Sequence, residues 1–176
     1  MTLLDVNKYL DNIDPQSYQY WCSQDEAPAL SEVQGFFNEI KFTLPDDFRD
    51  FATSRLGGLH IEVPEEVWPR RRGGAFWWFL YGLSVFGIGR EVPEWLDLRF
   101  QYHQFRMAGV PDLLPIMRIV SDADRYCFTR EGQIVHWCHE TTETKIVDES
   151  FADCLMRELL ALEERKDRVV RGAIPK

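Results

Sequence analysis

The stretch LLPIMRIVSDADRYCFTREGQIVHWC, residues 113–138, decides the fold class of this chain. It contains three short β-prone runs, residues 113–121, 125–130 and 133–138. Glu131-Gly132 is a compact turn, and Asp122-Ala123-Asp124 separates the first two runs. Connections this short cannot make a parallel crossover, which needs a dozen or more residues. The stretch therefore predicts an antiparallel meander.

Upstream of this meander, apolar residues recur at helical spacing. Residues 44–58 predict a further helix, with Pro45 at its first position, two acids in its first turn and Gly57-Gly58 at its end. Pro15 is expected to begin another short helical segment, which carries Tyr18, Trp21 and Cys22. The remaining apolar stripes of the first forty residues are Leu3, Val6, Tyr9 and Leu10, then Leu30, Val33, Phe37 and Ile40.

Strand patterns and two more helices complete the chain. Residues 59–63 alternate apolar and polar side chains, and residues 75–88 predict a long, largely buried central strand. Pro93 is expected to begin an inserted helix, whose apolar stripe is Trp95, Leu98, Tyr102 and Phe105. Residues 150–153 have the spacing of a capping box, which predicts a C-terminal helix with Phe151, Leu155, Leu159 and Leu162 on its apolar face.

These elements together predict an α+β fold. We expect a single domain with a mainly antiparallel sheet, N-terminal helices, one inserted helix and a C-terminal helix packed on the sheet, because regular βαβ alternation is absent.

The charge balance narrows the function. The chain has 29 Asp and Glu against 20 Lys and Arg, for a formal net charge of −9, and 13 of those acids lie within residues 1–69 with only 4 bases. Such a field disfavours direct binding to nucleic acid or to an anionic membrane and favours a basic partner. No apolar run reaches the roughly 20 residues that span a bilayer. The N-terminus does not have the pattern of a signal peptide, so we expect a cytoplasmic protein without a membrane partner.

Cysteine and histidine suggest no firm site. Four scattered cysteines, Cys22, Cys127, Cys138 and Cys154, are expected to be reduced thiols. The segment His136-Trp137-Cys138-His139 contains zinc's preferred ligand types, but in a strand at most two of them share a face. We expect neither a metal nor another cofactor.

Motifs for catalysis are missing as well. The sequence has no GxGxxG, no phosphate loop ending in GK[ST], no GxSxG and no HExxH. The triplet Arg70–Arg72 indicates an exposed loop, and the rings of Trp77, Trp78, Phe79 and Tyr81 indicate core packing. No catalytic residue is predicted.

Two blocks of the sequence resemble the SUKH superfamily. The first runs from Gly35 to Gly58 and includes Leu44-Pro45-Asp46-Asp47-Phe48 and Gly57-Gly58, like the family's order of helix, LP, acidic helix and GG. The second block includes Leu114-Pro115-Ile116, Asp124-Arg125-Tyr126-Cys127-Phe128, Gly132, Ile134-Val135-His136-Trp137 and Ser150-Phe151-Ala152-Asp153-Cys154-Leu155. On this resemblance, residues 28–164 are expected to be a SUKH-like α+β domain, residues 1–27 an N-terminal helical extension and residues 165–176 a basic tail.

The resemblance implies a non-enzymatic protein-binding domain. Family members include bacterial immunity proteins that bind and neutralise a toxin, frequently a nuclease or deaminase, and fungal regulators of cell-wall synthesis. An acidic chain suits a basic toxin domain as partner. The candidate contact residues are Asp46, Asp47, Asp50, Glu62, Glu65, Glu66 and, as an aromatic anchor, Trp68. A regulatory scaffold without a toxin partner stays open as an alternative, as does, less favoured, a small metal-dependent enzyme.

Overall fold

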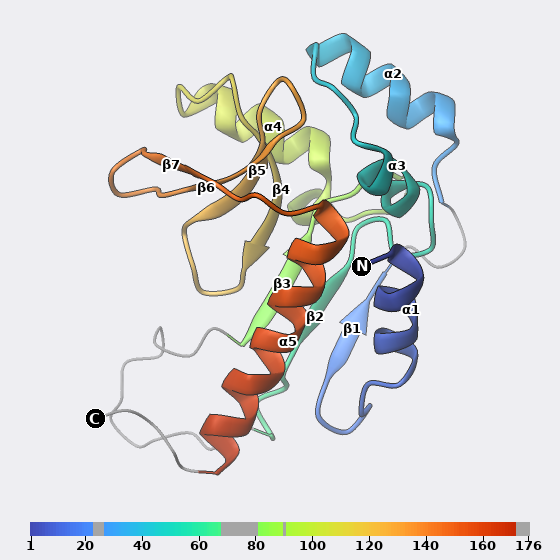
Figure 1. The fold of residues 1–176 in the computed structure, drawn as a ribbon, viewed down its shortest axis with the longest axis vertical. Coiled ribbons are helices and arrows are strands. Elements are labelled where there is room, and N and C mark those ends of the chain that lie inside the picture. The colour runs from blue at the N-terminus through green and yellow to red at the C-terminus, as the bar shows by residue number, and fades with distance from the viewer. Residues whose placement is uncertain (23–26, 68–80, 90, 172–176) are drawn as a thin grey trace.

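The fold is built on one antiparallel sheet. The computed structural model describes residues 1–22, 27–67, 81–89 and 91–171 (Figure 1). Within them, seven strands follow one another in chain order across the sheet, each antiparallel to its neighbours. The strands are β1 Gln19–Trp21, β2 His60–Glu62, β3 Gly82–Val85, β4 Leu114–Ile119, β5 Arg125–Phe128, β6 Ile134–Trp137 and β7 Thr144–Ile146. The predicted meander is β4 to β6, and the predicted α+β class is confirmed.

Helices flank this sheet and pack on both of its faces. They are α1 Leu3–Asp11, α2 Leu30–Ile40, α3 Asp46–Ala52, the short 3-10 helix η2 Glu94–Leu96, α4 Leu98–Met107 and α5 Phe151–Val170. The predicted N-terminal, inserted and C-terminal helices are therefore present. Asp97 caps α4 because its side chain accepts hydrogen bonds from the backbone N–H groups of Arg99 and Phe100.

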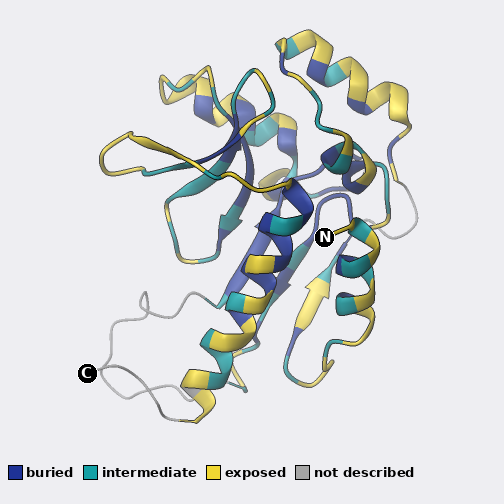
Figure 2. Cartoon of the chain, in the orientation of Figure 1, coloured by how far each residue is buried: buried dark blue, intermediate teal, exposed yellow. Residues whose placement is uncertain are grey.

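Helices α5 and α4 cover opposite faces of the sheet. On one face, the Tyr126 hydroxyl of β5 donates a hydrogen bond of 2.7 Å to Glu158 of α5. Cys127, the next residue along β5, points the other way and packs with Phe105 of α4. The side of α5 that lies against the sheet is buried at helical spacing (Figure 2), through Phe151, Cys154, Leu155, Glu158, Leu159 and Leu162.

A cluster of phenylalanine rings joins the helices to one end of the sheet. Phe48 of α3 is fully buried, with its ring centroid 5.1 Å from Phe128 of β5 and 5.0 Å from Phe151 of α5. The ring centroids of Phe37 of α2 and Phe51 of α3 lie 6.0 and 5.9 Å from that of Phe48. Edge-to-face contacts of this kind add to the stability that burial provides. The cluster thus fixes α3 beside the beginning of α5.

The backbone at Gly57 and Gly58 passes close to Gly87, two residues after the end of β3. A Cβ on Gly87 would lie 2.2 Å from the backbone N of Gly58, and Gly58 itself has φ of +78°. Glycine therefore meets the lack of space at position 87 and the left-handed conformation at position 58 without strain. These glycines do not end the preceding helix as expected, because α3 already ends at Ala52.

The structure corrects several sequence-based expectations. The segment after Pro15 is not helical, because residues 19–21 form the edge strand β1 and pair with β2. Pro45 is the residue before the first turn of α3 rather than its first position. Trp95 lies in η2 and is 43% exposed, so it does not share the buried face of α4. Strand β7 was not predicted.

The ends of two predictions are also different. Helix α5 continues to Val170, so the first residues of the expected basic tail are helical, supported by ion pairs four residues apart from Arg168 to Glu164 and from Arg171 to Asp167. Of the long strand expected over 75–88, residues 81–88 are described, and only 82–85 of these form a strand, β3, in the centre of the sheet. Arg70–Arg72, Trp77, Trp78, Phe79 and residues 172–176 lie outside the described residues.

No helix in the described part of the chain has the length and apolar character needed to cross a bilayer.

Candidate functional site

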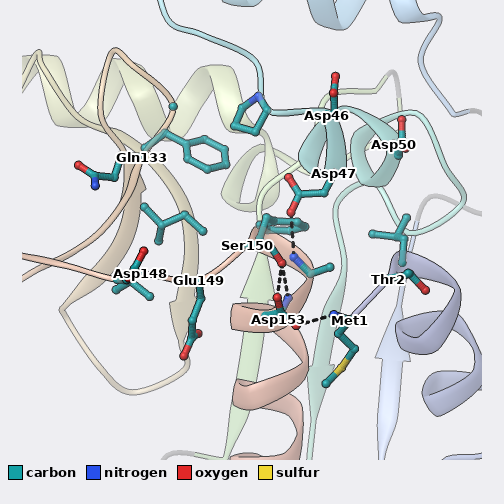
Figure 3. A pocket seen from close by; sticks show the side chains of 18 residues that line it. Met1, Thr2, Asp46, Asp47, Asp50, Gln133, Asp148, Glu149, Ser150 and Asp153 are labelled. Atoms are coloured by element: carbon teal, nitrogen blue, oxygen red, sulfur yellow. Dashed lines mark hydrogen bonds and ion pairs between the residues drawn. The ribbon is translucent and has the colours of Figure 1, made fainter.

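A groove opens where four segments of the chain meet. It has a volume of about 800 Å³. Its walls are the beginning of the chain, the start of α3, the β5–β6 turn and the segment that leads into α5 (Figure 3). The lining residues are Met1 to Leu3, Pro45 to Asp47, Asp50, Phe128, Gly132 to Ile134 and Val147 to Asp153. We call this feature the acidic groove.

The lining carries a strong negative charge. Six carboxylates line it, from Asp46, Asp47, Asp50, Asp148, Glu149 and Asp153. Among the described lining residues there is no Lys, Arg or His side chain, and the only cation is the α-amino group of Met1, 2.8 Å from Asp153. A concave surface lined by charges of one sign concentrates its field and attracts groups of the opposite sign.

Some of these carboxylates hold the walls of the groove together. Asp47 accepts hydrogen bonds from the backbone N–H of Phe48, at 2.9 Å, and of Ala152, at 3.2 Å, so it connects the starts of α3 and α5. Ser150 caps α5 with one of the two bonds of the predicted capping box, because its hydroxyl accepts from the backbone N–H of Asp153 at 3.2 Å. The same hydroxyl donates to the Asp153 carboxylate at 2.6 Å. Hydrogen bonds to its charged form from Met1 and Ser150 lower the pKa of Asp153.

The other carboxylates are available to a partner. The side chain of Asp46 is 86% exposed and that of Asp50 is 59% exposed, and both share the guanidinium of Arg49. Asp148 is exposed and has no hydrogen bond or ion pair with any described residue. In Figure 3, Asp47 points toward the start of α5, whereas Asp46 and Asp50 point away from it. Asp46, Asp50 and Asp148 are therefore the charges that a docking protein can neutralise directly.

The predicted contact residues fall on two surfaces. Asp46, Asp47 and Asp50 line the acidic groove. Glu62, Glu65 and Glu66 do not, because β2 carries the chain away from α3 before the turn that contains Glu65 and Glu66 (Figure 1). Glu62 lies on β2. Its carboxylate accepts a hydrogen bond of 3.2 Å from the side-chain amide of Gln19 and lies 3.4 Å from Nε2 of His60. Trp68 lies outside the described residues.

Sequence reasoning missed half of the groove. Asp148, Glu149 and Asp153 come from the run VDESFAD, residues 147–153, which predicted only the start of a helix. Three acids within six residues at a helix N-terminus were the available signal, and no local pattern connects them to residues 46–50, about a hundred positions earlier.

The histidine and cysteine segment does not form a metal-ligand set. His139 and His136 both face Asp124, at 3.0 and 3.8 Å, but nowhere in the described ranges do three His, Cys, Asp or Glu side chains meet as ligands would. Cys127, Cys138 and Cys154 are free thiols. Burial raises the pKa of the Cys154 thiol to about 12 and that of Cys127 further, which makes both poor nucleophiles.

The comparison with protein families identifies the chain. The family model of SMI1/KNR4 (SUKH-1) matches residues 27–157. The chain belongs to the SMI1/KNR4 family. No curated protein and no solved structure was found to match it. The predicted SUKH resemblance is thus confirmed, and the SUKH-1 match includes three walls of the acidic groove, from α3, the β5–β6 turn and the start of α5.

Proposed function

We propose that this SUKH-1 protein is a cytoplasmic, non-enzymatic immunity protein that binds a basic toxin domain and blocks it. The family supports a protein-binding role, because it includes immunity proteins. The observation that carries the proposal is the acidic groove, with six carboxylates and no basic side chain among its described lining residues. A nuclease or deaminase domain suits this surface, because enzymes that act on nucleic acid need a basic face.

The geometry supports docking rather than chemistry. The exposed carboxylates of Asp46, Asp50 and Asp148 surround the groove, while Asp47 and Asp153 are occupied in holding its walls. Acidic side chains gathered on one concave surface favour fast association and selection of a complementary partner. Loss of the partner's positive field on complex formation would explain how binding alone neutralises a nucleic-acid enzyme.

The first test is capture of the partner. The tagged protein is used as bait in lysate from its own cells at moderate salt, and the co-purifying proteins are identified and quantified. We expect one dominant partner with a basic domain, near equal stoichiometry, whose activity falls when the purified protein is added. An assortment of weak, salt-sensitive partners would contradict the immunity function and favour the regulatory scaffold.

The second test locates the surface. The variant D46N/D50N/D148N removes three exposed charges of the acidic groove, and the matched control E62Q/E65Q/E66Q removes three at the other predicted surface. We expect the first variant to slow association with the captured partner roughly ten-fold at low salt and to weaken the salt dependence of binding. The control should change association little. The opposite ranking would move the interface to the turn after β2.

A further inference from the structure

A row of polar side chains crosses the sheet on the face opposite α5. Ser84 of β3 pairs with Arg118 of β4. The next strand pair has Met117 opposite Tyr126, which places Arg118 opposite Arg125 of β5. Since Tyr126 faces α5, Arg118 and Arg125 lie on the other face. We call these two residues the arginine pair.

Arg118 has no charged partner. Its Nε lies 3.5 Å from the hydroxyl of Ser84, at the limit of a hydrogen bond, and neither terminal nitrogen has an acceptor among the described residues. It forms no ion pair with a described carboxylate, although the side chain is partly buried. Burial lowers the pKa of Arg118, which shows that the surroundings disfavour its charge.

Arg125 is held by the backbone rather than by an acid. Its Nη1 donates to the carbonyl oxygens of Asp122, Ala123 and Asp124, at 3.1, 2.7 and 2.8 Å. Its Nε is buried without an acceptor among the described residues. Burial and the neighbouring charge of Arg118 lower the pKa of Arg125.

Nearby groups also leave more hydrogen-bond donors than acceptors around the arginine pair. Trp137, which pairs with Arg125 across β5 and β6, has a buried indole Nε1–H without an acceptor in the described structure. The two nearest carboxylates are engaged elsewhere, because Asp124 accepts from His139 at 3.0 Å and Asp122 accepts from the backbone N–H of Asp124 at 3.0 Å. Donors therefore outnumber acceptors on this part of the sheet.

We propose that the arginine pair binds a phosphate group. Arg118 and Arg125 follow the Met117–Tyr126 pair at opposite positions of β4 and β5, and the charge of Arg118 is near enough to lower the pKa of Arg125. Two guanidinium groups offer more N–H donors than the two oxygens of a carboxylate can accept, whereas a phosphate offers three or four oxygens and a higher charge. The contact between Ser84 and Arg118 orients one of the two groups. This site lies on the face of the sheet opposite α5. It does not depend on the function of the acidic groove.

The test measures thermal stability in phosphate. The melting temperature of the purified protein is followed as inorganic phosphate is added, against sodium chloride and acetate at matched ionic strength. We expect phosphate to raise it by several degrees more than either control at tens of millimolar. An equal response to phosphate and chloride would overturn the proposal, and an equal response to acetate would overturn the preference for phosphate over carboxylate.

Variants assign that response to the arginine pair. R118M should lose the extra stabilisation by phosphate while melting no lower than the parent without phosphate, because an unpaired, partly buried charge has been removed. R168M is the matched control, since Arg168 is exposed and already paired with Glu164. If R118M fails to fold, R118K keeps the charge without the fork and should reduce the response. Full retention of the response in R118M or R118K would contradict the site.

Discussion

The acidic groove and the arginine pair hold like charges close together in two different ways. In the groove the charges are either exposed to water, as in Asp46, or matched to backbone N–H groups, as in Asp47. In the arginine pair the two cations are partly buried and lack a carboxylate among the described residues. The difference shows that like charges can cluster with little loss of stability where water or helix N-termini solvate them. Where neither does, clustering destabilises the folded state.

The largest expected effect is in the phenylalanine cluster that joins α3 to α5 beside the acidic groove. Replacing Phe48 by Ala removes a fully buried ring that contacts Phe128 and Phe151, and should lower the free energy of unfolding by about 3–5 kcal/mol. Chemical denaturation measures this. L30A is the control, because Leu30 is 54% exposed. A loss below about 1 kcal/mol for F48A would show that the ring cluster does not hold α3 to α5.

A second pair of variants separates the two kinds of carboxylate within the groove. D47A should cost about 1–2 kcal/mol, because two backbone N–H groups at the starts of α3 and α5 lose their acceptor. D46A should cost under about 0.5 kcal/mol, since its pair with Arg49 is exposed. Equal losses for the two neighbours would remove the distinction between structural and available charges.

A third variant measures how much a hydrogen-bond donor stabilises the buried carboxylate of Glu158. Glu158 is only 5% exposed, and it is matched by the Tyr126 hydroxyl at 2.7 Å and by Arg157. Y126F should cost about 1–2 kcal/mol, because it removes one of the two donors to Oε1 of Glu158 and leaves only Arg157 there. Y20F, at a tyrosine that is 38% exposed, serves as the control. If Y126F is neutral, a buried charge here needs no such partner, and the contrast with Arg118 loses its basis.

The smallest effect concerns pH on the arginine side of the sheet. Burial, with a contribution from Arg118, lowers the pKa of His60 below its ordinary value of 6.5, although Glu62 opposes this. As the pH falls, His60 is protonated in the unfolded chain before it is protonated in the folded one. The free energy of unfolding is therefore highest above pH 6.5 and decreases as the pH drops through 6.5 toward the lower pKa of the folded state. Melting curves from pH 7.5 to 5 should be flatter for H60Q than for the parent, with H103Q as control. A steeper slope in H60Q would reverse the assigned sign.

Local pattern predicted those parts of the fold in which one face of an element is buried over several turns or alternations. Helices α2 and α5 and the β4–β6 meander belong to this class, because apolar stripes and short polar turns are visible in the sequence. Strands β1 and β7 do not. Each has three residues, and β7 is exposed at all of them, so neither shows an alternation that could be read.

Only half of the acidic groove could be predicted, because only that half is visible as a local sequence pattern. The acids at 46, 47 and 50 stand together in the sequence, and the family resemblance gave them a role. Their meeting with residues 148–153 depends on the packing of Phe48 between Phe128 and Phe151, which no local signal reports. The predicted boundaries at residues 27 and 164 and the contact role of Glu62, Glu65 and Glu66 stay predictions.

The sequence by itself determined the class of fold, the family and the sign of the overall field, because periodicity, motif order and charge are properties of the chain. Tertiary structure alone decided which charges act together. The register of β4 on β5 sets Arg118 beside Arg125, and the contact of α3 with α5 turns two separate acidic runs into one groove. Electrostatic interactions depend on distance in space and on access to water, and both are set only when the chain has packed.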